Sequence, residues 1–219
     1  MPPDAARIPP TPQLIQTGVV AILRGTSLAH LRPVANALAL GGVTCLEITA
    51  TMPDWPVALR LLSALQRPGQ SVGAGTITSA EQAREAIDCG ATFLVSPAVC
   101  EDVLAVGVQA GVPCYPGAWT PTEVLTAWRL GAAAVKLFPA ASGGPAHLKM
   151  LRDPLPAIPI VPTGGIGLDQ VGGYITAGAV AVGLGSSLLG DALSGGDLQA
   201  LTDRAGRALR AVAAARAAG

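Results

Sequence analysis

The chain contains few of the residues that metal sites and nucleic-acid surfaces require. Of its 219 residues only two are histidines and four are cysteines, and the cysteines show no C-x-x-C spacing. No metal site is therefore predicted. Aromatic residues make up 3% of the chain and the formal net charge is zero. Because nucleic-acid binding usually relies on basic patches and stacking rings, we expect no nucleic acid partner.

The chain also lacks an apolar run long enough to span a bilayer, and its N-terminus has no apolar signal core. We expect no membrane partner. Residues 1–12 are rich in proline and are predicted to form a flexible tail before a single domain at 13–219. Three cysteines lie in or beside apolar runs, as is typical of buried free thiols in a reducing compartment, so a cytoplasmic location is expected.

Half of the residues are hydrophobic, which is enough for a large core. Short apolar segments alternate with segments of helical periodicity, and glycine-rich turns join them. A short helix is predicted to begin at residues 14–17. The predicted strands are residues 18–23, 43–49, 71–76, 91–96, 112–115, 132–138, 158–161 and 179–184, and helices are predicted between and after them.

Eight strands that alternate with eight helices indicate an α/β fold with a parallel sheet. We predict a single closed (β/α)8 TIM barrel with an N-terminal helical segment. The alternative is an open doubly wound sheet, which would place a dinucleotide fingerprint after the first strand. Residues 23–26 contain no G-x-G-x-x-G pattern, so the barrel is favoured.

Lys136 is one of only two lysines, and it stands in the apolar run Ala132–Pro139. The strand is predicted to end at Pro139, because proline cannot extend a ladder. Burial disfavours the charged ammonium and leaves part of it as a free amine. A free amine on a rigid strand can form a Schiff base with a ketone. The alternative is a lysine whose amine reaches water at the end of its strand.

In a parallel barrel the C-terminal ends of the strands meet at one face, where active sites gather. These ends carry Arg24, Glu47, Thr76, Pro97, Lys136, Thr163 and Ser186. Glu47 is the only acid among them, and a carboxylate between Leu46 and Ile48 needs either a partner or a chemical role. It is either a general acid/base beside Lys136 or a salt-bridge partner of Arg24 or Lys136. The two are compatible, because an active pair can be ion-paired at rest.

Two glycine-rich segments follow the seventh and eighth predicted strands. They are Thr163-Gly164-Gly165-Ile166 and Gly183-Leu184-Gly185-Ser186-Ser187. Glycines let backbone N–H groups approach an anion, and a short helix start faces it, so the pair indicates a phosphate site. Two ordinary glycine turns are the alternative. Thr76 is either a hydroxyl contact to substrate or a helix cap.

A strand lysine, a nearby carboxylate and a phosphate site are together typical of a class I aldolase. The amine attacks the ketone of an oxo acid, and the resulting iminium accepts electrons as the adjacent carbon–carbon bond breaks. Glu47 would move the protons. No cofactor is needed beyond the covalent imine between the substrate and Lys136.

Several blocks of the sequence carry a family resemblance. They are AILRG at 21–25, GGV at 41–43, LEIT at 46–49, GAGT at 73–76, VSP at 95–97, YPG at 115–117, TPTE at 120–123, KLFPA at 136–140, PTGGI at 162–166 and GLGS at 183–186. The chain resembles the 2-keto-3-deoxy-6-phosphogluconate (KDPG) aldolase family, which includes 4-hydroxy-2-oxoglutarate (KHG) aldolases. The resemblance extends from about residue 18 to about residue 201.

The resemblance implies an enzyme that releases pyruvate and an aldehyde, glyceraldehyde 3-phosphate or glyoxylate, from KDPG or KHG. It implies that Lys136 forms the Schiff base and that Glu47 is the acid/base. It further implies a pyruvate pocket of Thr76, Pro97 and Phe138 with Arg24 at the carboxylate end, and a phosphate site of Gly164, Gly165 and Ser186. Thr163 and Gly185, which belong to the same two glycine-rich segments, are also predicted to bind substrate. Family members are typically trimers, so a homotrimer is expected.

One position departs from the family pattern. Many members carry an arginine four residues after the glutamate, and this chain has Thr51 there, which cannot make a bidentate charged contact. The Pro53-x-Trp55 pattern resembles the branch that cleaves 2-keto-3-deoxy-6-phosphogalactonate, whereas the PTGG block at 162–165 resembles the gluconate branch. That galactonate aldolase is one alternative. A phosphate-binding isomerase or epimerase, or a non-catalytic sugar-phosphate binder, is another.

Overall fold

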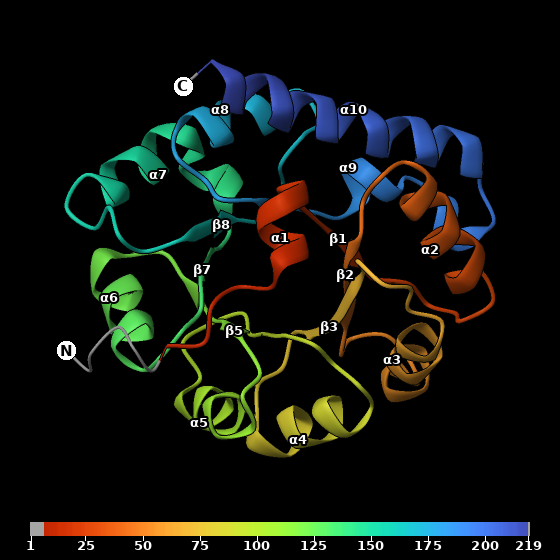
Figure 1. The fold of residues 1–219 in the computed structure, drawn as a ribbon, viewed down its shortest axis with the longest axis horizontal. Helices are drawn as coiled ribbons and strands as arrows, with labels where there is room; N and C mark the ends of the chain where they lie inside the picture. The colour runs from red at the N-terminus through yellow and green to blue at the C-terminus, as the bar shows by residue number, and fades with distance from the viewer. Residues whose placement is uncertain (1–6, 219) are drawn as a thin grey trace.

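The structure is a computed structural model that describes residues 7–218. Parallel strands curl around a common centre, and helices cover their outer side (Figure 1). The predicted α/β class with a parallel sheet is therefore confirmed. This architecture brings the C-terminal ends of strands far apart in sequence to the same end of the molecule.

All strands are short and buried. They are β1 Val19–Leu23, β2 Cys45–Thr49, β3 Ser71–Gly75, β4 Leu94–Val95, β5 Cys114–Tyr115, β6 Gly117–Ala118, β7 Val135–Leu137, β8 Ile160–Pro162 and β9 Val182–Leu184. Burial on both faces explains why they read as continuous apolar runs rather than as alternating ones.

The helices follow the strands along the chain. They are α1 Pro12–Thr17, α2 Leu31–Leu40, α3 Trp55–Ala64, α4 Ala80–Asp88, α5 Glu101–Ala110, α6 Pro121–Arg129, α7 Gly144–Arg152, α8 Val171–Thr176, α9 Ser186–Leu189 and α10 Leu198–Ala217, with short 3-10 turns at Ala140–Ser142 and Ala192–Ser194. Thr120 and Glu123 form a capping box at the start of α6, and Pro121 lies in its first turn.

The strand order advances one step at a time. Six strands lie in the order β5-β4-β3-β2-β1-β9, and a second sheet has the order β6-β7-β8. A single bridge between Thr163 and Gly183 joins the end of β8 to β9. No reversal of strand order occurs in the described sheets, so the open doubly wound alternative does not fit this structure.

The predicted strand at 112–115 has a continuation that the sequence did not indicate. Tyr115 in β5 pairs with Val95, whereas Gly117 in β6 pairs with Lys136. Pro116 separates the two, because it has no N–H group to donate. Its carbonyl nevertheless accepts a 2.9 Å hydrogen bond from the Lys136 backbone N–H. The chain thus passes from one sheet to the other at Pro116.

Two hydrophobic clusters stabilise the fold. The larger one lies between the strands and the outer helices. The smaller one fills the inside of the curl and consists of Leu14, Val20, Cys45, Phe93, Val95, Tyr115, Ala133, Ala134, Val161 and Ala181. Gly73 leaves room for the Phe93 ring, since a Cβ at this glycine would overlap it.

The N-terminal segment packs on the domain from residue 7 onward. The Arg7 guanidinium donates hydrogen bonds to the carbonyls of Trp128 and Ala132, at 2.9 and 2.8 Å. The flexible tail was predicted for residues 1–12, of which residues 1–6 lie outside the described residues. α1 lies across one end of the set of strands (Figure 1).

Candidate active site

Lys136 occupies the middle of β7 and points to the inside of the curl. Its neighbours Val135 and Leu137 belong to the outer cluster, and side chains alternate between the two faces of a strand. Only 7% of the residue is exposed. Its Nζ lies 5.2 Å from the centroid of the Phe138 ring. The amine is therefore held in a largely apolar environment on a rigid strand.

Glu47 is the inward-facing acid of β2, between the outer-cluster residues Leu46 and Ile48. It is 3% exposed, and its Oε1 atom is buried without a hydrogen-bond partner. Within the described part of the chain, Glu47 forms no salt bridge with either Arg24 or Lys136. A buried carboxylate oxygen without a partner is costly, which indicates a functional group rather than a stabilising ion pair.

Glu47 and Lys136 line the same small cavity, of about 10 Å³. This volume is about what one water molecule needs. Its other lining residues are Leu14, Val20, Val95, Tyr115, Val161, Thr163 and Gly183. Of the residues predicted from the sequence, the structure thus brings Lys136, Glu47 and Thr163 together around one small cavity.

The remaining predicted residues follow the strands at the same end but do not line this cavity. Arg24 is exposed after β1, Thr76 and Pro97 are half-buried after β3 and β4, and Phe138 is 36% exposed after β7. Thr76 has a φ of 60°, which is a strained conformation for a β-branched residue. Such strain is concentrated at functional sites in proteins.

The two glycine-rich segments present free backbone donors. Gly164 and Gly165 have positive φ values of 97° and 75°. Among the described residues, neither their N–H groups nor those of Ser186 and Ser187 donate a hydrogen bond within the protein. Gly165 and Ser186 are exposed, while Gly164 and Gly185 are half-buried. Four N–H groups on adjacent strand ends are available to an anion.

Thr51 takes part in a chain of hydroxyl hydrogen bonds. Its Oγ1 donates to Thr49 Oγ1 at 3.0 Å, and Thr49 Oγ1 donates to the Leu23 carbonyl at 3.4 Å. Leu23 directly precedes Arg24. The Thr51 hydroxyl is therefore bonded only to neutral groups, and Arg24 directly follows the strand whose last carbonyl accepts the second of these hydrogen bonds.

Several residues of the site were not predicted from the sequence. Leu14 and Tyr115 line the cavity, and two glycines make room for its polar groups. A Cβ at Gly75 would overlap the Glu47 carboxylate, and one at Gly183 would overlap the Thr163 hydroxyl. Side chains alternate between the two faces of a strand, so Tyr115 could have been predicted to point inward if Cys114 points outward. Glycines inside buried strands were a usable signal for close approach.

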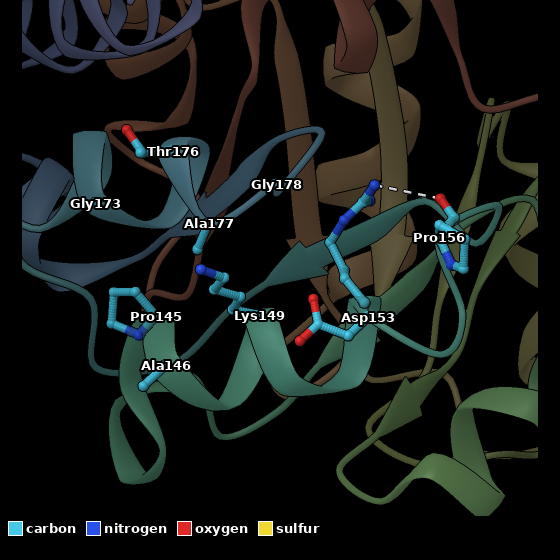
Figure 2. Close-up of a pocket in the computed structure, with 10 residues that line it drawn as sticks. Pro145, Ala146, Lys149, Asp153, Pro156, Gly173, Thr176, Ala177 and Gly178 are labelled. Atoms are coloured by element: carbon cyan, nitrogen blue, oxygen red, sulfur yellow. Dashed lines mark hydrogen bonds between the residues drawn. The ribbon is translucent and has the colours of Figure 1, made fainter. Parts of the chain in front are cut away.

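A larger hollow, of about 570 Å³, lies on the outer side between α7 and α8 (Figure 2). It contains Lys149, the second lysine of the chain, which is exposed, together with Arg152 and Asp153. Arg152 donates to the Pro156 carbonyl at 3.2 Å. No buried carboxylate faces Lys149 among the residues that line this hollow, so the cavity of Lys136 is the better candidate.

The described residues contain no group of three or more His, Cys, Asp and Glu side chains that could hold a metal ion. In the same part of the chain, no helix has both the length and the apolar character needed to cross a membrane.

The family model and the curated relatives agree on one family. The model of the "KDPG and KHG aldolase" family matches residues 12–203. The chain is 36% identical over 193 residues to a 2-dehydro-3-deoxy-phosphogluconate aldolase of Dickeya dadantii, covering 87% of this chain and 90% of that one. It is 34% identical over 194 residues to a probable 2-dehydro-3-deoxy-6-phosphogalactonate aldolase of Rhizobium meliloti, covering 88% and 91%.

One similar solved structure is a KDPG aldolase from Legionella pneumophila with pyruvate captured at low pH as a covalent carbinolamine intermediate. Its TM-score is 0.82 at 28% sequence identity, and the match covers 90% of this chain and 97% of that one.

Proposed function

The chain belongs to the KDPG and KHG aldolase family, and from this premise we propose that it cleaves KDPG to pyruvate and glyceraldehyde 3-phosphate. It is an aldolase, that is, a carbon–carbon lyase of the class I type. The observation that carries the proposal is the small cavity lined by both Lys136 and Glu47. The isomerase, epimerase and non-catalytic alternatives are set aside, because the relatives are aldolases.

In the proposed mechanism the neutral Lys136 amine attacks the C2 ketone of the substrate to give a carbinolamine. Glu47 donates the proton with which the hydroxyl leaves as water, and an iminium forms. The Glu47 carboxylate then removes the proton of the C4 hydroxyl. The C3–C4 electron pair moves into the iminium, so that an aldehyde leaves and an enamine remains. Protonation at C3 and hydrolysis release pyruvate and restore the amine.

The roles of the remaining residues are also proposals. Thr76, Pro97 and Phe138 would enclose the pyruvate portion, and Arg24 would bind its carboxylate. Thr163, Gly164, Gly165, Gly185 and Ser186 would hold the phosphate, supported by the free N–H donors on two adjacent strand ends. The fixed φ values of the two glycines favour this arrangement, since their N–H groups need no further ordering on binding.

The substrate can be tested with three compounds: KDPG, its galactonate epimer at C4, and KHG. We expect kcat/KM to be highest for KDPG, because the 2-dehydro-3-deoxy-phosphogluconate aldolase of Dickeya dadantii is 36% identical to this chain and the PTGG block is present. KHG lacks the phosphate and should be at least about tenfold poorer, since it forgoes charge-assisted hydrogen bonds. Coupled detection of pyruvate gives the rates.

A higher rate on the galactonate epimer would instead support the alternative suggested by Thr51 and Trp55. No pyruvate from any of the three compounds would contradict the proposed function.

We also propose that the strands form a closed (β/α)8 barrel. In this arrangement β5 and β6 are two halves of one strand, interrupted at Pro116, and the bridge from Thr163 to Gly183 completes the ring. A cytoplasmic location is proposed as well. It is supported by the four free cysteines, three of which are buried.

The homotrimer remains a proposal, and an exposed apolar stripe on α3 and its C-cap residue Leu65 supports self-association. Val57, Leu61 and Leu65 are spaced four residues apart and are 52, 38 and 40% exposed. Residues four apart share one face of a helix, and such a stripe is unusual on a surface that faces only water. Light scattering should give three times the 21.8 kDa of one chain. The mass of one chain would contradict the proposal.

A further inference from the structure

α1 lies at the end of the strands opposite to the candidate substrate loops. It ends at Thr17, immediately before β1, and therefore lies at the N-terminal ends of the strands. Figure 1 shows it crossing the centre of the strand arrangement. Its residue Leu14 is fully buried and belongs to the inner cluster, together with side chains from the strands. α1 thus inserts a side chain into the inside of the curl.

A helix of six residues is too short to be stable by itself, so contacts with the rest of the domain must fix it. On one side, the Tyr115 hydroxyl accepts a 2.9 Å hydrogen bond from the Thr11 N–H and donates one of 3.3 Å to Thr11 Oγ1. On the other, Arg216 of α10 donates to the carbonyls of Ile15 and Gln16, at 2.8 and 3.0 Å. These contacts link α1 to β5 and α10.

Leu14 and Tyr115 both line the cavity that holds Lys136 and Glu47. Leu14 of α1 therefore forms part of the floor of this cavity, beside Tyr115 of β5, whose hydroxyl binds Thr11 just before α1. We propose that α1 is a plug that positions Lys136 and Glu47 and keeps water away from them, with Leu14 and Tyr115 as positioning residues for the imine chemistry. This inference rests on the proposed function.

The groups below the cavity support this role because they stay neutral. Burial raises the pKa of the Cys45 thiol to about 12, and the nearby Glu47 charge adds to the effect. Burial also raises the pKa of the Tyr115 phenol. Among the described residues that line the cavity, Glu47 supplies the carboxyl group and Lys136 the amine, and the others are apolar, hydroxyl-bearing or glycine. A floor of neutral groups adds no further charge beside this pair.

Replacing Leu14 by alanine removes three carbon atoms from the floor. The cavity, now about the size of one water, would then admit more water to the carboxylate and the amine. Both side chains would also gain freedom to leave their reactive positions. Because small misplacements of reacting groups cost up to about 10²-fold in rate, we expect kcat for pyruvate release to fall at least about tenfold. KM should change less than about twofold, since the proposed phosphate contacts lie at the other end.

The experiment compares Leu14→Ala with Leu14→Met, which restores most of the volume, and with Ile15→Ala on the same helix. Ile15 is 41% exposed and provides the matched control. Thermal unfolding first establishes a temperature at which all variants are folded. Two rates are then measured: pyruvate release, and exchange of the pyruvate methyl protons in D2O by NMR. The exchange reports proton transfer in the enamine without carbon–carbon cleavage.

We expect both rates to fall in Leu14→Ala, to recover in Leu14→Met and to stay unchanged in Ile15→Ala. A folded Leu14→Ala protein with the rates of Ile15→Ala would overturn the inference. If Leu14→Ala does not fold, Tyr115→Phe decides, because it removes only the hydroxyl that anchors Thr11. Both rates should fall in that variant too, and unchanged rates would overturn the plug.

Failure of the proposed function would look different. Wild-type protein would then form no borohydride-reducible adduct with pyruvate and would catalyse no methyl exchange. If the wild-type protein shows both while Leu14→Ala matches it, only the plug is wrong.

Discussion

Lys136→Ala is expected to abolish pyruvate release, with kcat lowered on the order of 10⁴-fold or more. Alanine has no amine, so the iminium that accepts the electrons of the broken bond cannot form. The fold should survive, because the Lys136 amine takes part in no side-chain hydrogen bond or salt bridge among the described residues, while the backbone bond of Lys136 to Pro116 is kept by alanine. Removing a buried amine in an apolar environment should leave the melting temperature unchanged or raise it.

Borohydride reduction in the presence of pyruvate tests the same residue directly. A reduced adduct should appear by peptide mass spectrometry on the peptide that contains Lys136. The chain supplies its own control, because its second lysine, Lys149, is exposed in the hollow between α7 and α8 (Figure 2). Lys149→Ala should keep wild-type rates. An adduct on Lys149, or turnover by Lys136→Ala, would show that the mechanism has been assigned to the wrong amine.

Glu47→Gln should lower kcat roughly 10²- to 10⁴-fold, the usual range for the loss of a general acid/base. The amide keeps the shape of the side chain and its place over Gly75 but cannot exchange protons. Since Oε1 is buried without a partner, the neutral amide should not lower the melting temperature. A structural salt bridge would predict the reverse, with stability lost and activity kept. Methyl-proton exchange of pyruvate in D2O should fall together with kcat.

The matched control for Glu47 is Glu85→Gln, which changes an exposed residue of α4. This variant should turn over like the wild-type protein. A rate for Glu47→Gln equal to that of Glu85→Gln would remove Glu47 from the mechanism.

Gly75→Ala offers a second route to the same group without altering it. The added Cβ would overlap the Glu47 carboxylate, so the side chain must move and kcat should fall although every predicted site residue is present. Gly172→Ala is the control, because a Cβ there meets its nearest atom, the Ala211 carbonyl oxygen, at an ordinary 3.9 Å. Equal rates in the two variants would contradict a fixed position of Glu47.

The sequence by itself determined the features that depend on neighbouring residues. The TPTE block at 120–123 predicts a capped helix, and Glu123 accepts hydrogen bonds from the backbone N–H groups of Thr120 and Trp119. These bonds, that of Thr120 first, lower the pKa of the Glu123 carboxyl. The buried strands could be predicted in the same way, because strands covered on both faces form apolar runs. A lysine or glutamate inside such a run stands out from its apolar neighbours, so the sequence itself indicates Lys136 and Glu47.

Only the tertiary structure decided which residues complete the site. Thr11 and Tyr115 are 104 residues apart, and no local pattern indicates that they meet or that Leu14 enters the same cavity as Lys136. The need for Gly75 follows from the position of a side chain on the neighbouring strand. The division of the predicted strand into β5 and β6 at Pro116 likewise depends on the tertiary structure, because Tyr115 pairs with β4 and Gly117 pairs with β7. Local sequence determines whether each segment forms a helix, a strand or a turn. Contacts across the interior depend on the relative positions of several segments, which no single segment specifies, so they arise only when the whole domain is packed.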